Sequence, residues 1–326
     1  MSKISHPSLL IDLGHVGPNG LPLNSAPWFQ REMALCREWG FQLKIANDRV
    51  SLIYDQEQLV PYWIQQETPA LVWDMLRVKG YLRLESTNDE AIELARRGAP
   101  SGTLVYAEEQ LAGKGRKDRR WFSPPRTGLY FSLIVKPTRP AEFWPILTHA
   151  ASVALVQAIR NTLECERIHT TLDVDIKWPN DVLLSGKKCA GILLESIHAE
   201  KKFQAAVIGL GINVHEGSIP ESLKSEAACL DGMAQAYVPR RKLLVNYLQQ
   251  FQIYYRMFEE AKQDEILKGW KAFSSMWNGV EVCISDGDLH RTALTCGLNE
   301  MGALLVRTSD GGVETILAGD ISVKRA

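Results

Sequence analysis

Five cations lie within one short stretch, "AGKGRKDRRWFSPP" at residues 112–125, and they are Lys114, Arg116, Lys117, Arg119 and Arg120. Gly113 and Gly115 alternate with the first of them, and glycine lets backbone N–H groups come close to an anion. Lysine and arginine are suitable donors to a polyphosphate. A solvated basic loop is the alternative interpretation. The glycines, and the apolar residues that follow from Trp121, support phosphate binding as strongly as a solvated loop.

A second stretch, "IKWPNDVLLSGKKCAGILLES" at residues 176–196, places Lys177 at the end of a predicted strand. A lysine between apolar neighbours is partly buried and therefore needs an acceptor. A substrate carboxylate or phosphate would serve, and so would a salt bridge to Asp181. Asn180 and Asp181 are also ordinary turn residues, so neither indicates a site by itself.

Two further stretches carry polar or glycine patterns. Ser86, Thr87 and Asn88 in "ESTND" offer donors and acceptors beside a predicted helix start, which suits a neutral ligand with C=O and N–H groups. A simple helix cap would explain the same residues. In "GLGIN" at 209–213 no helix pattern follows the glycines, which argues against a dinucleotide fingerprint. Glycines in a strand instead predict the close approach of another backbone or a ligand.

The bulk composition limits the class of protein. The chain has 326 residues with a formal net charge of −1, 45% hydrophobic and 23% charged residues, which predicts a globular protein of more than one domain. Neutrality argues against a general nucleic-acid binder. No signal-peptide pattern and no long apolar run is visible, so we expect neither export nor a membrane span. The six cysteines are scattered, which argues against a disulfide framework or a zinc site and favours a cytoplasmic location.

The elements that must position these residues begin with a helix from Trp28 to Trp39, ended by Gly40. A β-hairpin about Asn47 and Asp48 follows. A helix followed by a hairpin is typical of the second half of a winged helix, whereas residues 1–27 are turn-rich and show no first half.

The middle of the chain alternates helices and strands. A helix in "STNDEAIELARRG" has Thr87 and Glu90 at capping-box spacing. Long helices are predicted from Phe143 to about Leu163 and from Pro239 to about Lys262, with the proline at the first helical position. "GLYFSLIVKP" alternates as a strand, and "LDVDIKW", "CAGILLES" and "FQAAVIGLGINV" are expected to pair as neighbours in one sheet. The last fifty residues are short strands split by glycine turns, which predicts a small β-barrel.

These motifs stand in the order found in bacterial biotin protein ligases (biotin–[acetyl-CoA-carboxylase] ligases), and the chain resembles that family over roughly residues 80–326. The resemblance implies an α+β fold with three parts. Residues 1–68 would form a short, degenerate winged-helix-like module. Residues 69–273 would form a class II synthetase-like catalytic domain, a mixed sheet with flanking helices, and residues 274–326 an SH3-like β-barrel.

The resemblance also implies a reaction. Biotin and Mg·ATP would give biotinyl-5′-AMP, from which biotin passes to a lysine of biotin carboxyl carrier protein. ATP, Mg²⁺ and biotin would be bound, and no protein ligand to a metal is implied. A homodimer is expected as in many relatives. We expect no membrane association, and the weakly basic N-terminus argues against operator binding.

Site residues follow from the same resemblance. Lys177 and Arg116 would be catalytic. The biotin-binding set would be Ser86, Thr87, Asn88, Gln110, Gly113, Lys114, Gly115, Arg116, Lys177 and Gly191. The nucleotide-binding set would be Arg116, Arg119, Trp121, Asn180, Lys188 and Asn213.

The chain departs from the family pattern at two positions, and two other functions stay open. Lys114 stands where arginine is common, and Asp118 stands where glycine is common, so we expect a stiffer basic loop. A lipoate or octanoate ligase or transferase of the related fold is the nearest alternative. A biotin-responsive DNA-binding repressor is the alternative from another class.

Overall fold

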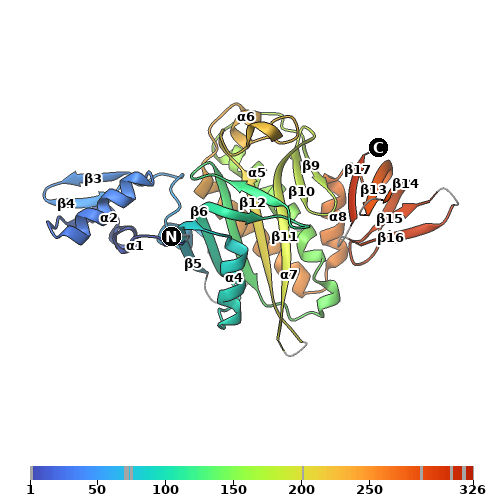
Figure 1. The fold of residues 1–326 in the computed structure, drawn as a ribbon, viewed down its shortest axis with the longest axis horizontal. Helices are drawn as coiled ribbons and strands as arrows, with labels where there is room; N and C mark the ends of the chain where they lie inside the picture. Colours follow the sequence, from blue (N-terminus) through green and yellow to red (C-terminus); the bar gives the residue numbers. More distant parts are fainter. Residues whose placement is uncertain are drawn as a thin grey trace.

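The computed structural model describes residues 3–69, 73, 76–199, 202–286, 289–308, 311–317 and 321–325. The protein is elongated, with an N-terminal unit at one end, a large mixed sheet in the middle and a smaller sheet at the other end (Figure 1). Helices and strands follow one another in mixed order along the chain. The predicted α+β class is therefore confirmed.

The N-terminal unit has its own apolar core, formed around Leu10, Phe29 and Trp63. Its elements are β1 (Ile4–Ser5), α1 (Ser8–Val16), η1 (Gly17–Asn19), β2 (Leu21–Pro22), α2 (Pro27–Glu38), β3 (Leu43–Ala46), β4 (Arg49–Leu52) and α3 (Pro61–Glu67). The predicted helix and hairpin are confirmed, and Asn47 and Asp48 both have the positive φ of a two-residue hairpin turn.

Residues 1–27, which the sequence analysis described as turn-rich, contain a helix that was not predicted, because α1 lies there and buries Leu9, Leu10 and Leu13. Only residues 23–26 join β2 to α2, which leaves no room for a second helix between them. The winged-helix assignment itself stays a prediction.

The central sheet combines β5 (Arg77–Leu84), β6 (Thr103–Lys114), β7 (Arg120–Ser123), β8 (Gly128–Val135), β9 (Val174–Lys177), β10 (Asp181–Leu184), β11 (Lys187–Ala199) and β12 (Lys202–Asn213). Its order is β1-β5-β6-β8-β12-β11-β10-β9, with β7 paired to β6. The pair β5–β6 is parallel and the other described pairs are antiparallel. The predicted neighbours do lie in one sheet. There β11 and β12 pair directly, whereas β10 separates β9 from β11. The strands β5, β6, β7 and β10 were not predicted.

Helices cover both faces of this sheet. They are α4 (Thr87–Arg96), η2 (Ala141–Phe143), α5 (Ile146–Cys165), η3 (Glu221–Leu223), α6 (Leu230–Ala234), α7 (Arg240–Glu259) and α8 (Gln263–Phe273). The residues of α4 share a core with Val105, Ile134 and Val207, whereas α5 and α7 share one with Tyr106 and Leu133. Because both faces are covered, all residues of β8 are buried, and the strand predicted there is confirmed.

Two predicted helix starts need correction. The cap of α4 is Ser86, whose Oγ accepts a hydrogen bond from the backbone N–H of Asp89 at 3.4 Å, and not the predicted capping box at Thr87 and Glu90. Pro239 precedes α7 as its N-cap and is not its first helical residue.

The C-terminal sheet consists of β13 (Asn278–Asp286), β14 (Leu289–Leu298), β15 (Leu304–Arg307), β16 (Val313–Ile316) and β17 (Ile321–Arg325). Its antiparallel order β16-β15-β14-β13-β17 is consistent with the predicted small barrel. Trp178, directly after β9, donates its indole N–H to the Gly302 carbonyl at 3.1 Å, and Ser275 binds the Asp175 carboxylate. None of the described helices is long and apolar enough to cross a membrane.

Candidate active site

A cavity of about 250 Å³ lies where the start of α4, the β6–β7 hairpin and the strands β9 to β12 meet. It brings together predicted site residues that are far apart in the sequence: Ser86, Thr87, Asn88, Gln110, Lys114, Gly115, Arg116, Arg119, Trp121, Lys177, Asn180, Lys188, Gly191 and Asn213. Gly113 lies outside this set. A Cβ at Gly113 would stand 2.6 Å from the Trp121 carbonyl oxygen, so this glycine allows β6 and β7 to pair closely.

One end of the cavity is a hydrogen-bonded group of buried and half-buried polar side chains. The amide oxygen of Gln110 accepts hydrogen bonds from the backbone N–H and the hydroxyl of Thr87, at 2.8 and 3.0 Å. The Asn88 amide donates to the Glu195 carboxylate at 2.7 Å, and its oxygen accepts from the Ser132 hydroxyl at 2.5 Å. These partners fix the donors and acceptors in orientations that suit a neutral polar ligand.

Ser132 and Glu195 were missed by the sequence analysis. Ser132 is fully buried and lies 2.8 Å from the Thr87 hydroxyl. A signal existed for Ser132, because it is the lone polar residue among the apolar residues of "GLYFSLIV". Glu195 follows an apolar run, which indicates the end of a buried strand as readily as a site.

Glycines of β11 and β12 make room for the side chains of the site. A Cβ at Gly209 would overlap Asn88 Oδ1, and a Cβ at Gly211 would stand 2.5 Å from the Trp121 ring. The Trp121 ring also comes close to Gly191. A close approach was predicted from "GLGIN", but side chains of α4 and β7 make it, and not the predicted backbone or ligand.

The sequence resemblance implies that this cavity binds biotin. If so, we expect Gly209→Ala to weaken that binding by about tenfold, because the added methyl group must displace Asn88 and overpacking costs about 1–3 kcal/mol. Titration calorimetry with biotin measures this loss. Gly269→Ala in α8 is the matched control, since a Cβ there meets only ordinary contact at 3.6 Å. Equal biotin affinity for the two variants would contradict the role given to Asn88.

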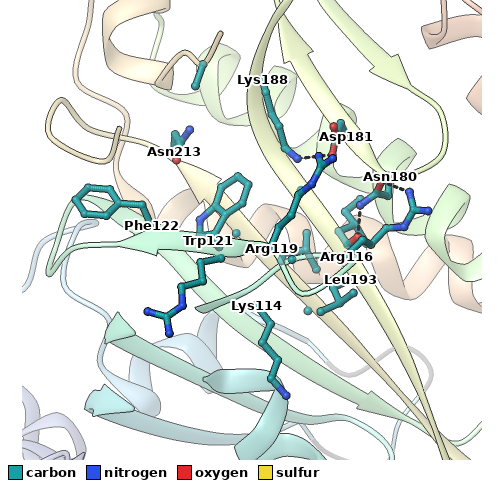
Figure 2. Close-up of a pocket in the computed structure, with 18 of the residues that line it drawn as sticks. Lys114, Arg116, Arg119, Trp121, Phe122, Asn180, Asp181, Lys188, Leu193 and Asn213 are labelled. Carbon is teal, nitrogen blue, oxygen red and sulfur yellow. Dashed lines mark hydrogen bonds and ion pairs between the residues drawn. The ribbon is translucent and has the colours of Figure 1, made fainter. Parts of the chain in front are cut away.

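The basic stretch is folded as a tight hairpin. Lys117 and Asp118 have φ values of 57° and 55°, and the Gly115 N–H donates to the Arg119 carbonyl at 2.7 Å. Lys114 forms an ion pair with Asp89 in the first turn of α4, and this hydrogen bond raises the pKa of Lys114 above its usual value. In Figure 2, Lys114 accordingly points away from Lys188.

The other side of the hairpin contacts the "KWPND" motif. Arg116 donates to the Asn180 side-chain oxygen at 3.1 Å, and the Asn180 amide donates to the Ile192 carbonyl at 2.7 Å. The tip of the basic stretch is thereby held over the cavity by β10 and β11. Lys177 lies at the end of β9, directly opposite Asp181 in the strand register, and lines the same cavity.

Another part of the cavity wall has an aromatic ring beside a cation. The Lys188 ammonium lies 5.4 Å from the centre of the Trp121 ring and forms a 2.7 Å ion pair with Asp181 (Figure 2). The Trp121 indole N–H is buried and has no hydrogen-bond partner among the described residues. The Asn213 amide donates to the Ala228 carbonyl at 3.4 Å. A ligand with a flat ring and a negatively charged group could stack on Trp121 and pair with Lys188 here.

Comparison with known proteins assigns this arrangement to a family. Residues 80–213 match the biotin/lipoate A/B protein ligase family. The chain is 36% identical over 248 residues to the bifunctional ligase/repressor BirA of Bacillus subtilis, which covers 74% of this chain and 72% of that relative. This chain belongs to the biotin protein ligases. The resemblance inferred from the motifs is therefore confirmed.

Other biotin protein ligases agree with this assignment. The chain is 40% identical over 132 residues to the biotin–[acetyl-CoA-carboxylase] ligase of Paracoccus denitrificans, across 40% of this chain and 52% of that one. The solved biotin protein ligase from Aquifex aeolicus in complex with biotin and ATP superposes with a TM-score of 0.60 at 29% identity. That match covers 77% of this chain and 97% of the other, and it confirms the predicted catalytic fold.

Proposed function

We propose that this protein activates biotin with ATP and transfers it to a lysine of biotin carboxyl carrier protein. The observation that carries the proposal is the single cavity that joins the oriented polar group at α4 to the cationic hairpin, Lys177 and the Trp121 ring. One end suits the ureido ring of biotin, and the other suits a nucleotide. Between them lie the cations that the chemistry requires.

In the first step, a carboxylate oxygen of biotin attacks the α-phosphorus of ATP. An O–P bond forms, the bond from the α-phosphorus to the bridging oxygen breaks, and pyrophosphate leaves. Negative charge grows on phosphoryl oxygens, and preorganised cations stabilise it. Lys177 and Arg116 are the residues to which we assign this role.

In the second step, the neutral amine of the carrier lysine attacks the acyl carbon of biotinyl-5′-AMP. A C–N bond forms, the C–O bond to the phosphate breaks, AMP leaves and the nitrogen loses a proton. The hairpin at residues 112–121 would shield the mixed anhydride from water until the carrier arrives.

Magnesium would enter with ATP. Among the described residues, no group of three His, Cys, Asp or Glu side chains could hold a metal ion. Mg²⁺ usually keeps waters and phosphate oxygens as ligands, so ATP itself can carry it without a protein cage. The residues of this cavity are therefore assigned to the organic substrates only.

Mass spectrometry of the protein incubated with Mg·ATP and, separately, biotin, lipoate or octanoate tests the proposal. We expect a biotinyl-AMP peak, followed by transfer to a carrier-domain lysine. A lipoyl or octanoyl adduct in the absence of a biotin adduct would move the protein to the related lipoate or octanoate enzymes. It would also contradict the role given to Ser86, Thr87 and Asn88.

We expect Arg116→Ala to release biotinyl-AMP at least about tenfold faster, because a hydrogen bond from a charged group contributes about 1.5–3 kcal/mol. Its present contact, Asn180, would no longer hold the hairpin over the cavity. Dissociation of radiolabelled adenylate gives the rate. Arg97→Ala, at the exposed end of α4, is the control. Unchanged dissociation in the Arg116 variant would refute this assignment.

A biotin-responsive repressor is the second candidate, favoured by the relative from Bacillus subtilis that is a bifunctional ligase/repressor. The four-residue connection before α2 argues against it, because a helix-turn-helix needs a further helix there. A gel-shift titration with the protein's own upstream DNA, with and without biotin and ATP, decides. Tight, biotin-dependent binding would establish the repressor, and weak, salt-sensitive binding would exclude it.

A cytoplasmic location, favoured by the scattered cysteines, and a homodimer, expected as in many relatives, complete the proposal. The central sheet ends in β1 on one side and β9 on the other, and such edges can pair with a second copy. Light scattering of the purified protein, with and without biotin and ATP, gives the oligomeric state.

A further inference from the structure

A glutamate of the N-terminal unit reaches into the catalytic part of the protein. Glu57 lies between β4 and α3, and its Oε1 pairs with the Arg240 guanidinium. Its Oε2 accepts a hydrogen bond from the Arg240 backbone N–H at 3.0 Å and lies 3.2 Å from His215 Nε2. One carboxylate therefore contacts both the first turn of α7 and the residue that follows Val214.

The arginine side of this junction is rigid. The Arg240 side chain is only 3% exposed, and it also donates to the Glu108 carboxylate at 2.7 Å and to the Gly128 carbonyl at 3.2 Å. Next to it, the Lys242 N–H donates to the Gln56 carbonyl at 3.2 Å. The Glu57 carboxylate is thus fixed in place by the central sheet and by α7.

The histidine side of the junction holds a segment of the cavity wall. His215 Nδ1 lies 2.8 Å from the Asp231 carboxylate, and the Tyr237 ring stacks on the imidazole at 4.8 Å. The His215 carbonyl accepts hydrogen bonds from the backbone and the hydroxyl of Ser218, at 3.2 and 2.7 Å. His215 therefore anchors the start of the segment 215–229. This segment lines the cavity with Ser218, Ile219, Pro220, Leu223 and Ala227.

This segment borders the nucleotide end of the cavity. The Lys188 N–H donates to the Glu226 carbonyl at 2.9 Å, and the Lys188 carbonyl accepts from the Ala228 N–H at 3.0 Å. Lys188 is also the cation beside the Trp121 ring. The oriented polar group at Thr87 and Asn88, in contrast, lies at the α4 end.

At this junction, neighbouring opposite charges favour the charged forms of His215 and Glu57. Burial alone would lower the pKa of His215, but its hydrogen bonds to Asp231 and Glu57 and their charges raise it above the usual 6.5. Burial raises the pKa of Glu57, yet the Arg240 charge and the His215 hydrogen bond bring it down to about 2. His215 consequently lies between the carboxylates of Asp231 and Glu57, and Glu57 in turn pairs with Arg240.

We propose that Glu57 is a positioning residue of the ligase, which holds the segment 215–229 through His215 and thereby sets the affinity for ATP. The inference rests on the proposed function. The N-terminal unit then takes part in nucleotide binding without touching the nucleotide. Biotin affinity depends on the other end of the cavity and is independent of this contact.

Glu57→Gln tests the proposal in the full-length protein. We expect the KM for ATP to rise about tenfold, as for the loss of a charged hydrogen bond, whereas kcat and the KM for biotin stay within about twofold. Glu67→Gln is the matched control, because Glu67 pairs with Arg241 in the same junction at 3.2 Å and lies outside the His215 contacts. Thermal unfolding of both variants shows how much each loses in stability.

A double-mutant cycle identifies His215 as the link. His215→Gln should reproduce the change in KM for ATP, and the double variant should add little to either single change, because the two residues act through one contact. Equal effects of the Glu57 and Glu67 variants on the KM for ATP would overturn the proposal, and so would additive effects in the cycle.

The pH dependence gives a second readout. A histidine whose pKa is raised in the folded state stabilises its contacts below its usual pKa and loses them as pH rises through the raised pKa. The KM for ATP should therefore rise with pH in the wild type, and Glu57→Gln should move that inflection to lower pH. Asp231 and Tyr237 are unchanged in this variant. An inflection that stays in place would count against the role of Glu57.

One experiment distinguishes failure of the positioning role from failure of the proposed function. If the wild-type protein formed no biotinyl-AMP, calorimetric titration with ATP alone would still compare the Glu57 and Glu67 variants. Weaker ATP binding in the Glu57 variant alone would support the positioning role even then. Equal ATP binding in both variants would overturn it.

Discussion

Replacing Lys177 by alanine is expected to slow adenylate formation by about two to three powers of ten, the usual loss for one preorganised charge-stabilising donor. The residue lies at the end of β9, where the strand register and the following Trp178 and Pro179 fix the backbone. The hairpin that carries Arg116 contacts the next residue, Asn180. Both cations therefore line one cavity, where the proposed function assigns them to the reacting phosphoryl group.

Pyrophosphate release in single-turnover reactions measures this effect. Lys136→Ala is a suitable control, because Lys136 is exposed and follows the far end of β8. Thermal unfolding of both variants separates a loss of catalysis from a loss of fold. An unaltered rate of pyrophosphate release in the Lys177 variant would refute the catalytic role.

The second large effect is expected in stability. Glu108→Ala should lower the free energy of unfolding by about 3 kcal/mol, since it removes one partner from a buried pair and leaves a buried charge. Glu108 and Arg240 are only 2% and 3% exposed, and Glu57 alone would remain to compensate the guanidinium. The value stands at the lower end of the usual range because that second carboxylate stays.

Urea unfolding followed by circular dichroism gives the comparison. Glu314→Ala removes one partner of an exposed pair, in which Arg291 and Glu314 are 42% and 44% exposed, and we expect a change of about 1 kcal/mol or less. A similar midpoint for both variants would show that Arg240 finds other partners or water. The slope of the transition should stay unchanged if only stability is affected.

The parts of the fold that were predictable are those with strong local patterns. The helix of α2, the hairpin at Asn47 and Asp48 and the long strand of β12 follow from apolar spacing and turn residues. Of the missed elements, α1 and β10 have weak local signals, whereas the longer strands β5 and β6 were not recognised despite their apolar residues. α1 is preceded by Pro7 without a side-chain cap, and β10 has only four residues and follows the turn formers Pro179 and Asn180.

In the site, too, residues within short motifs were predictable, whereas their contacts with residues far along the chain were not. Short motifs contain most of the cavity lining, because each motif is continuous in sequence, whereas the lining segment from Ser218 to Ala227 has no such motif. The supports of those residues come from far along the chain: Glu195 lies 107 residues from Asn88, and Glu57 lies 158 residues from His215. No spacing rule joins such positions, so only the folded chain reveals the contacts of Glu195 and the Glu57 junction.

The contact between Trp178 and Gly302 limits how the enzyme could be recombined with its relatives. Gly302 has a φ of 77°, and a Cβ there would stand 2.6 Å from the buried His149 ring. A C-terminal sheet from another ligase would have to bring a glycine and a free carbonyl to this point, or the indole beside Lys177 would lose its acceptor. Chimeras that exchange this sheet should therefore be chosen by the match at the β14–β15 turn, and overall sequence identity is a poorer guide.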